Sequence, residues 1–321
     1  MKKVLVLFLA MAMILCVSGC SKEPEADYTV GIIQIMEHAA LDAATEGFKS
    51  TLEAKMKEAG KTVKFEFGNA QGETQQCATI ATNYANNKVD LILGNATPAV
   101  AAAINASSTI PVIGTSVTDF AEFGPLDSDG SSSVANLTGT SDGVDAQLYV
   151  NCTLDIVPDV KKVSVLYCSA ESNSKIQADN YIEAMSKTKS DVVCTVYTFD
   201  DSNGMQNTVT QAIADCDALY IPTDNTAASN MTIVANACQP AKVPVICGEE
   251  NMMKSGGLVT VSISYTTIGE MAGEMAFEIL VNGADISSMP IEHAPTLVGK
   301  YNAAFAEAIG MTMPAGYEAA E

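Results

Sequence analysis

Residues 28–67 read YTVGIIQIMEHAALDAATEGFKSTLEAKMKEAGKTVKFEF, an apolar run, an amphipathic run and a second apolar run. The outer runs, 28–35 and 63–67, have the length and composition of buried strands. Five apolar residues between them recur every three or four positions: Leu41, Ala44, Phe48, Leu52 and Met56. This spacing predicts a helix with one apolar face, which Gly60 ends. A strand, a helix and a strand in this order predict a right-handed crossover between parallel strands.

The alternation of strands and helices continues along the chain in two runs. Further strands are predicted at 89–93, 110–113 and 133–138 in the first run, and at 163–167, 192–199, 218–221, 243–246 and 258–263 in the second. Helices are predicted at 73–86, 143–156, 172–188, 203–215, 225–238, 249–254 and 266–281. Another helix is predicted to begin at Thr97-Pro98, with Thr97 as its N-cap. Two such runs predict an α/β fold of two similar, doubly wound lobes with parallel sheets, joined by a hinge.

The N-terminus has the pattern of an export signal. Lys2 and Lys3 precede an apolar stretch, 4–17, that is short for a transmembrane helix. The stretch ends in Val-Ser-Gly-Cys at 17–20, which resembles a bacterial lipobox with cleavage before Cys20. The alternative is an ordinary signal peptide followed by an incidental cysteine. The favoured interpretation is an exported protein that is anchored to the outer face of the cell membrane through lipidated Cys20.

Five parts are therefore expected along the chain. They are a lipoprotein signal peptide at 1–19, the lipidated Cys and a tether at 20–27, an N-terminal α/β lobe at 28–140, a C-terminal α/β lobe at 141–264, and a crossover helix and segment at 265–321 that completes the lobes.

The composition excludes several classes of function. The chain has 17 basic and 38 acidic side chains, a formal net charge of −21, and every basic residue is Lys. A nucleic-acid partner is not expected, because neutralising phosphates requires a basic surface. Two His residues cannot make a three-His zinc site, no calcium-loop spacing occurs, and the glycine motifs of nucleotide sites are absent, so no metal or cofactor is expected. After Cys16 and Cys20, seven Cys remain, and most are expected to be small buried hydrophobes.

Polar residues follow most of the predicted strands. In open parallel sheets, ligands bind outside the carboxyl ends of the strands, so two facing lobes would place these residues along one cleft. The candidate ligand-binding residues are Gln34, His38, Asn95, Thr97, Ser116, Thr118, Asp142, Ser172, Asn173, Asp224, Asn225, Glu249 and Tyr265.

Several of the same segments carry a family resemblance. They include GIIQIMEHAALD at 31–42, ATPA at 96–99, SVTD at 116–119, NLTGTSD at 136–142, SNS at 172–174, YIPTDNTAAS at 220–229 and GEE at 248–250. Together these motifs resemble the ABC-transporter substrate-binding proteins, in the family that includes tryptophan- and phenylalanine-binding lipoproteins. The resemblance implies a type I periplasmic-binding-protein fold, hinge closure on a small ligand, and membrane permease and ATPase subunits as partners.

The resulting hypothesis is an amino-acid-like ligand held between the lobes, and the family resemblance suggests an aromatic one. Without Arg, its carboxylate is expected at helix N-termini and at the hydroxyls of Thr97, Ser116 and Ser172. Its ammonium is expected at one or two of the acids that follow strands or lie at a crossover: Asp142, Asp224, Glu249 and Glu250. His38 is expected either to hydrogen-bond the carboxylate or to cap the next helix. Tyr265 is expected either to form an aromatic wall or to pack in the core.

Two other functions remain open from the sequence. The same cleft would serve a ligand-sensing lipoprotein with a signalling partner. Residues 139–143 also match the Gly-x-Ser-x-Gly nucleophile motif, and Ser141, Asp224 and His293 follow in the chain order of an α/β-hydrolase. This hydrolase is the less favoured interpretation, because the preceding strand is polar and the glycines lie where the lobes are expected to join. No catalytic residue is therefore assigned.

Overall fold

The first strand–helix–strand unit forms as the sequence predicts. In the computed structural model, which describes residues 26–295 and 297–320, β1 (Tyr28–Gln34), α2 (Ala39–Glu58) and β2 (Val63–Asn69) follow in order. Strands β1 and β2 are parallel. The predicted signal peptide and Cys20 lie outside the described residues.

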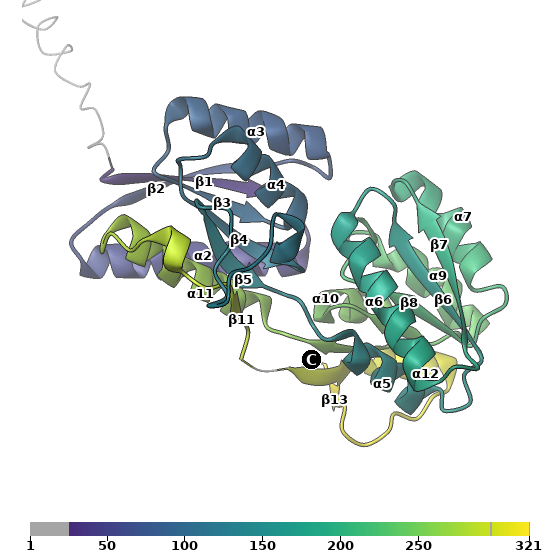
Figure 1. The fold of residues 1–321 in the computed structure, drawn as a ribbon. Helices are drawn as coiled ribbons and strands as arrows, with labels where there is room; N and C mark the ends of the chain where they lie inside the picture. Colours follow the sequence, from purple (N-terminus) through teal and green to yellow (C-terminus); the bar gives the residue numbers. More distant parts are fainter. Residues whose placement is uncertain (1–25, 296, 321) are drawn as a thin grey trace, which may run out of the picture.

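This unit begins one of two sheets (Figure 1). The sheet of the N-lobe has the order β11-β5-β4-β3-β1-β2. Its further elements are α3 (Thr74–Asn87), β3 (Leu91–Asn95), α4 (Thr97–Ala106), β4 (Val112–Val117), the short 3-10 helix η1 (Phe120–Glu122), β5 (Leu137–Ser141) and β11 (Glu292–His293).

The sheet of the C-lobe has the order β13-β12-β10-β9-β8-β6-β7. Its strands are β6 (Lys162–Cys168), β7 (Val193–Phe199), β8 (Ala218–Ile221), β9 (Val245–Cys247), β10 (Val259–Ser262), β12 (Val298–Tyr301) and β13 (Glu318–Ala319). Its helices are α5 (Ala146–Ile156), α6 (Ser172–Thr188), α7 (Ser202–Ala212), α8 (Asn225–Ala228), α9 (Met231–Ala241), α10 (Glu250–Gly256) and α12 (Ala303–Ile309).

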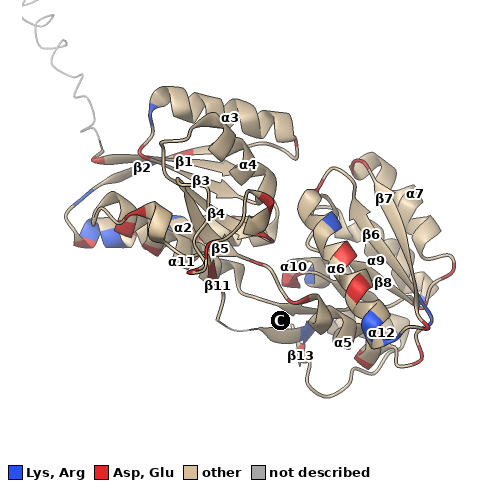
Figure 2. Ribbon diagram, in the orientation of Figure 1, with Lys and Arg blue, Asp and Glu red and all other residues tan. Residues whose placement is uncertain are grey.

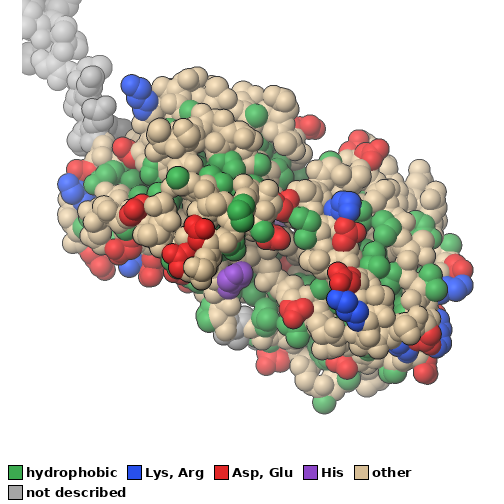
Figure 3. All heavy atoms as spheres, in the orientation of Figure 1, with side chains coloured by type: hydrophobic (Ala, Val, Ile, Leu, Met, Phe, Trp, Pro, Cys, Tyr) green, Lys and Arg blue, Asp and Glu red, His purple; other side chains and the backbone are tan. Residues whose placement is uncertain are grey.

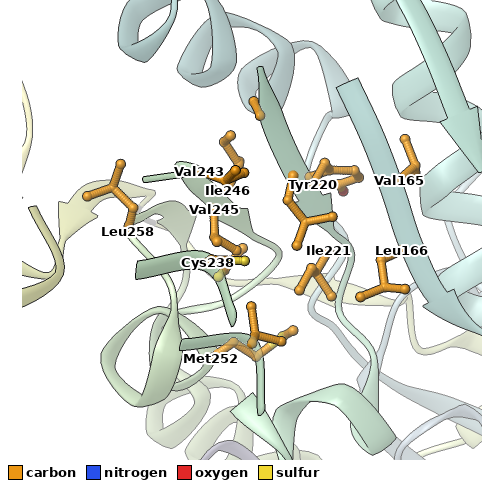
Figure 4. Packing of buried hydrophobic residues seen from close by; sticks show 14 of the residues in the cluster. Val165, Leu166, Tyr220, Ile221, Cys238, Val243, Val245, Ile246, Met252 and Leu258 are labelled. Carbon is orange, nitrogen blue, oxygen red and sulfur yellow. The ribbon is translucent and has the colours of Figure 1, made fainter. Parts of the chain in front are cut away.

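The two lobes share one topology, so the predicted fold of two similar doubly wound lobes is confirmed. Within each lobe the first five strands lie in the order 2-1-3-4-5 and are parallel. An added strand departs from this pattern, since β12 is antiparallel to β10. In the C-lobe, apolar side chains of the central strands pack against one another and against Met252 of α10 (Figure 4).

The chain crosses between the lobes three times. It passes from β5 to α5, from β10 to α11 (Tyr265–Leu280), and from β11 to β12. The segment after residue 264 therefore contributes to both lobes. Helix α11 packs on α2 so closely that a Cβ placed at Gly269 would lie 2.1 Å from the Ala44 carbonyl oxygen. The 3-10 helix η2 (Ile286–Ser288) then leads to β11.

Three elements differ from the sequence prediction. The strand expected at 133–138 is β5 at Leu137–Ser141. Its polar residues did not indicate a buried strand, because Thr138 and Thr140 are buried only by forming hydrogen bonds through their hydroxyls. The helix expected at 143–156 begins at Ala146, where the Asp145 carboxylate accepts from the Gln147 N–H. The helix expected at 225–238 is two helices, α8 and α9, because the chain leaves helical geometry at Asn230.

Charged residues lie on the outer faces of both lobes (Figure 2). On the face drawn in Figure 3, Lys side chains are scattered and form no broad patch. Seven cysteines of the described residues are free thiols, and five of them are buried. Within residues 26–295 and 297–320, no helix combines the length and the apolar composition that crossing a membrane requires.

Candidate functional site

The strand order places a topological switch point in each lobe. In the N-lobe it lies between β1 and β3, which are paired neighbours on opposite sides of the chain reversal. In the C-lobe it lies between β6 and β8. Ligands of open α/β sheets bind outside the carboxyl ends of the strands at such points. The two points face each other, because His38 Nε2 of the N-lobe lies 3.2 Å from Asn225 Oδ1 of the C-lobe.

A cavity of about 690 Å³ opens between the lobes beside this contact. The N-lobe contributes the ends of β1 and β2 with the start of α3, and the C-lobe contributes the segments after β6 and β7. The charged side chains that line it are all acidic: Glu37, Glu73, Glu171, Asp200 and Asp201. The cavity therefore favours cationic or zwitterionic groups over anions.

Five of the predicted residues each bury a polar atom that has no hydrogen-bond partner among the described residues. These atoms are His38 Nδ1, Asn95 Oδ1, Thr97 Oγ1, Ser116 Oγ and Asn173 Oδ1. Buried polar atoms in proteins are nearly always paired, because an unpaired one costs about 1–3 kcal/mol. A polar ligand at the facing strand ends would supply the missing partners.

Backbone strain occurs at the same strand ends. Ala96, after β3, has φ of 85°, and Ser116, in β4, has φ of 55°. Residues other than Gly adopt such angles at a cost, and they concentrate at functional sites. The prediction that Thr97 caps α4 is wrong in detail, because Ala96 occupies the N-cap and Thr97 is the first helical residue. The positive φ of Ala96 moves the helix start by one position and leaves the Thr97 hydroxyl unpaired.

Gln34 is fully engaged within the N-lobe. Its Nε2 donates to the Met36 carbonyl oxygen at 2.9 Å and to Asp42 Oδ1 at 2.7 Å. Its Oε1 accepts from Thr45 at 2.6 Å and from Asn95 Nδ2 at 3.4 Å. These bonds use its whole donor capacity and both acceptor positions. In this conformation Gln34 holds Asn95 in place, and direct contact with a ligand remains a prediction.

Three of the four predicted acids, Asp142, Asp224 and Glu249, are buried, and two of these also cap helices. Glu249 accepts from the Asn251 and Met252 N–H groups at 2.6 Å each, at the start of α10. Asp224 accepts from the Ala227 and Cys168 N–H groups at 2.7 Å each. Burial raises the pKa of Asp224, and it raises the pKa of Glu249 to about 7.

Asp142, which follows β5, is hydrogen-bonded to a residue of the second segment that crosses between the lobes. Its carboxylate accepts from the Tyr265 hydroxyl at 2.6 Å and from the Thr118 hydroxyl at 3.2 Å. Thr118 in turn accepts from Gln177 Nε2 of the C-lobe at 3.0 Å. Burial raises the pKa of Asp142. Tyr265 is buried beside α2 and acts here in hinge packing, while its predicted role as an aromatic wall is untested.

Of two further candidates, one is exposed to solvent and the other forms ion pairs with lysines. Ser172 is exposed at the start of α6. Glu250 forms ion pairs with Lys254 at 2.8 Å and Lys300 at 2.6 Å, so it is a poor partner for a ligand ammonium.

Glu171 is not among the residues predicted at the site, although it lies only three residues after the end of β6. Its carboxylate accepts four hydrogen bonds, from the backbone and side chain of Asn225 and of Thr226, at 2.7–2.9 Å. An acid directly after a buried strand and before a Ser-Asn-Ser helix start was the available signal.

The hydrolase triad is not assembled. The Ser141 hydroxyl donates to the Thr118 carbonyl oxygen at 3.1 Å and accepts from the Gly143 N–H at 3.0 Å. His293 is exposed on β11, and Asp224 lies in the other lobe with its oxygens on backbone N–H groups. Of the two glycines of the motif, Gly143 lies in the crossing from β5 to α5, whereas Gly139 lies within β5 and pairs with Gly114 of β4.

Two facing α/β lobes with strand ends at a shared cleft and a three-segment hinge define a type I periplasmic-binding-protein fold. The family model described as ABC transporter substrate binding protein matches residues 29–315. This chain belongs to that family, whose members are solute-binding proteins and not enzymes.

Individual relatives match over most of their length. A protein of Clostridioides difficile (strain R20291) named tyrosine-binding protein is 33% identical over 307 residues, which cover 90% of this chain and 87% of that protein. A solved domain of Streptococcus pneumoniae in complex with L-Trp is 30% identical with a TM-score of 0.81, over 89% of this chain and 96% of that one.

A third relative has been solved in an open form without ligand. The ligand-free, open structure of a substrate-binding protein with adhesive properties from Clostridium difficile is 31% identical, with a TM-score of 0.68 over 92% of this chain and 99% of that one. The TM-score is higher with the L-Trp complex at almost the same identity.

Proposed function

We propose that this chain is the extracytoplasmic, lipid-anchored substrate-binding component of an ABC importer for an amino acid, with L-tyrosine and L-tryptophan as first candidates. The observation that carries the proposal is the set of unpaired polar atoms at the two facing switch points. A zwitterion with donors and acceptors at one end matches this set. The names of the tyrosine-binding relative and of the L-Trp complex supply the candidate side chains.

The residues predicted from the sequence divide the ligand between them by charge; they lie behind the strand ends and are not among the residues that line the cavity itself. With no Arg in the chain, the carboxylate meets the hydroxyls of Thr97, Ser116 and Ser172. The ammonium meets one or two of the buried acids Asp142, Asp224 and Glu249, which are the partners predicted from the sequence. Lobe closure follows because the ligand contacts both lobes and so binds the closed state more tightly than the open one. Permease and ATPase subunits then receive the ligand-loaded protein.

A thermal-shift screen of the twenty amino acids tests the ligand class, followed by calorimetry on those that raise the melting temperature. L-tyrosine or L-tryptophan is expected to give the largest shift. Ser116→Ala removes an unpaired buried hydroxyl and is expected to weaken binding by about tenfold, or about 1.4 kcal/mol. Ser186→Ala, on an exposed turn of α6, is the matched control and leaves the affinity unchanged. A shift with sugars or nucleosides and none with any amino acid would contradict the proposal.

A further inference from the structure

Glu171 is a hydrogen-bond acceptor at the wall of the cleft. Both of its oxygens accept hydrogen bonds, two each, from the Asn225 and Thr226 backbone N–H groups and side chains. The backbone N–H groups of Asn225 and Thr226 reach one oxygen each, so both oxygens act as acceptors. Glu171 therefore fixes whichever groups donate to it.

The Asn225 amide is one of those groups, so its orientation follows from chemistry. Its Nδ2 donates to Glu171 Oε2 at 2.7 Å, because the amide oxygen would face a negative charge in the opposite orientation. Its Oδ1 must then point the other way, and it lies 3.2 Å from His38 Nε2. An amide oxygen accepts only, so His38 Nε2 carries a proton.

The second ring nitrogen of His38 is left without a partner. Nδ1 is buried and has no hydrogen bond among the described residues. Burial lowers the pKa of His38, while the nearby carboxylates of Glu171 and Asp42 oppose this effect. In the neutral ring that burial favours, a protonated Nε2 makes Nδ1 a bare acceptor.

We propose that Glu171, Asn225 and His38 form a relay across the cleft that fixes His38 in its neutral Nε2–H form, so that Nδ1 accepts a hydrogen bond from a donor group of the bound ligand. The inference rests on the proposed function and deepens it. The donor is the ligand ammonium or a side-chain N–H or O–H, and it is not the carboxylate, whose oxygens a bare lone pair repels. The sequence suggested that His38 hydrogen-bonds the ligand carboxylate or caps the next helix. Here its Nδ1 instead accepts a hydrogen bond from a donor group of the ligand.

The relay also depends on closure. His38 belongs to the N-lobe, and Glu171 and Asn225 belong to the C-lobe. The tautomer is therefore set when the lobes approach, which couples the preference for a donor to the closed state.

A matched pair of variants tests the relay by calorimetry. The side chain of Gln can reach the position of Nε2 and keep the bond to Asn225, whereas Asn offers an acceptor near the position of Nδ1. His38→Gln is expected to weaken L-tyrosine binding by about tenfold, and His38→Asn is expected to retain more of the affinity.

Three ligand analogues identify the donor. The loss caused by His38→Gln is expected to vanish either for 3-(4-hydroxyphenyl)propionate, which lacks the ammonium, or for L-phenylalanine, which lacks the hydroxyl. If the loss vanishes instead for tyramine, which lacks the carboxylate, or is equal for all ligands, the proposal is overturned.

Nitrogen NMR reads the tautomer directly. The chain contains two histidines, so a 15N-histidine-labelled sample compared with the His38→Gln variant assigns both rings. With saturating L-tyrosine, His38 is expected to show a protonated Nε2 and an unprotonated Nδ1. A proton on Nδ1 overturns the relay. If no amino acid binds the unaltered protein, the proposed function fails, whereas a proton on Nδ1 in an amino-acid complex overturns the relay alone.

Discussion

At the scale of single residues, the C-lobe carries carboxylates that are buried without a cation. Glu249 illustrates their cost, because burial raises its pKa from 4.5 to about 7 even though two backbone N–H groups donate to it. The folded protein therefore holds a proton that the unfolded chain releases. The contribution of this protonated Glu249 to the free energy of unfolding is complete below about pH 4.5, and it is lost as the pH rises towards 7.

We expect the free energy of unfolding, measured by urea denaturation at pH 5, 6, 7 and 8, to fall with rising pH. The slope for one proton is about 1.4 kcal/mol per pH unit. Glu249→Gln is expected to make the fall of the free energy of unfolding with pH shallower. Asp142 and Asp224 are expected to cause the pH dependence that remains, because burial raises their pKa values too. Glu183→Gln, at an exposed position on α6, is the control. An unchanged slope in Glu249→Gln would mean that this carboxylate is ionised in the folded protein at pH 5.

At the scale of elements, the contact between α2 and α11 sets where the second crossing enters the N-lobe. Backbones approach closely there because the helices meet at glycines, with Gly269 against Ala44 and Gly47 against Thr266. A side chain at either glycine forces the helices apart, because the obstacle is backbone and cannot rotate away.

We expect Gly269→Ala to lower the free energy of unfolding by about 1–3 kcal/mol in urea denaturation, because its Cβ would lie 2.1 Å from the Ala44 carbonyl oxygen. Gly204→Ala in α7 is the matched control. The nearest atom to its added Cβ is 3.7 Å away, and Ala favours the helix, so a gain of about 0.5–1 kcal/mol is expected. Equal effects of the two substitutions would show that α2 and α11 can separate freely.

At the scale of the whole molecule, binding is expected to change the distance between the lobes. The contacts that span the cleft, His38 to Asn225 and Thr118 to Gln177, exist when the lobes are close together. Small-angle X-ray scattering is the suitable measurement, because the free cysteines complicate labelling with thiol probes. The radius of gyration is expected to decrease when L-tyrosine is added and to stay constant with glucose. Equal radii with and without a bound amino acid would contradict closure by hinge motion.

Much of the fold was predictable because secondary-structure periodicity is a local property. The apolar spacing of Leu41, Phe48 and Met56 gave α2, and the predicted α6 has the observed bounds. Elements with buried polar residues were less predictable. β5 contains Thr138 and Thr140, whose hydroxyls bond to groups up to 152 residues away, and no local sequence pattern indicates such partners.

The candidate site shows the same division. The sequence by itself determined which residues follow the strands, and hence that His38, Asn95, Thr97, Ser116 and Asn173 gather at the strand ends. It also determined that no guanidinium group is available to hold a carboxylate. The tertiary structure alone decided that Gln34 is bound within its lobe, that Asp224 and Glu249 cap helices, and that Glu171 orients Asn225 towards His38. The reason is physical: residue type and position along a strand follow from the order of the chain, whereas the direction of a hydrogen bond depends on which distant atoms folding brings together.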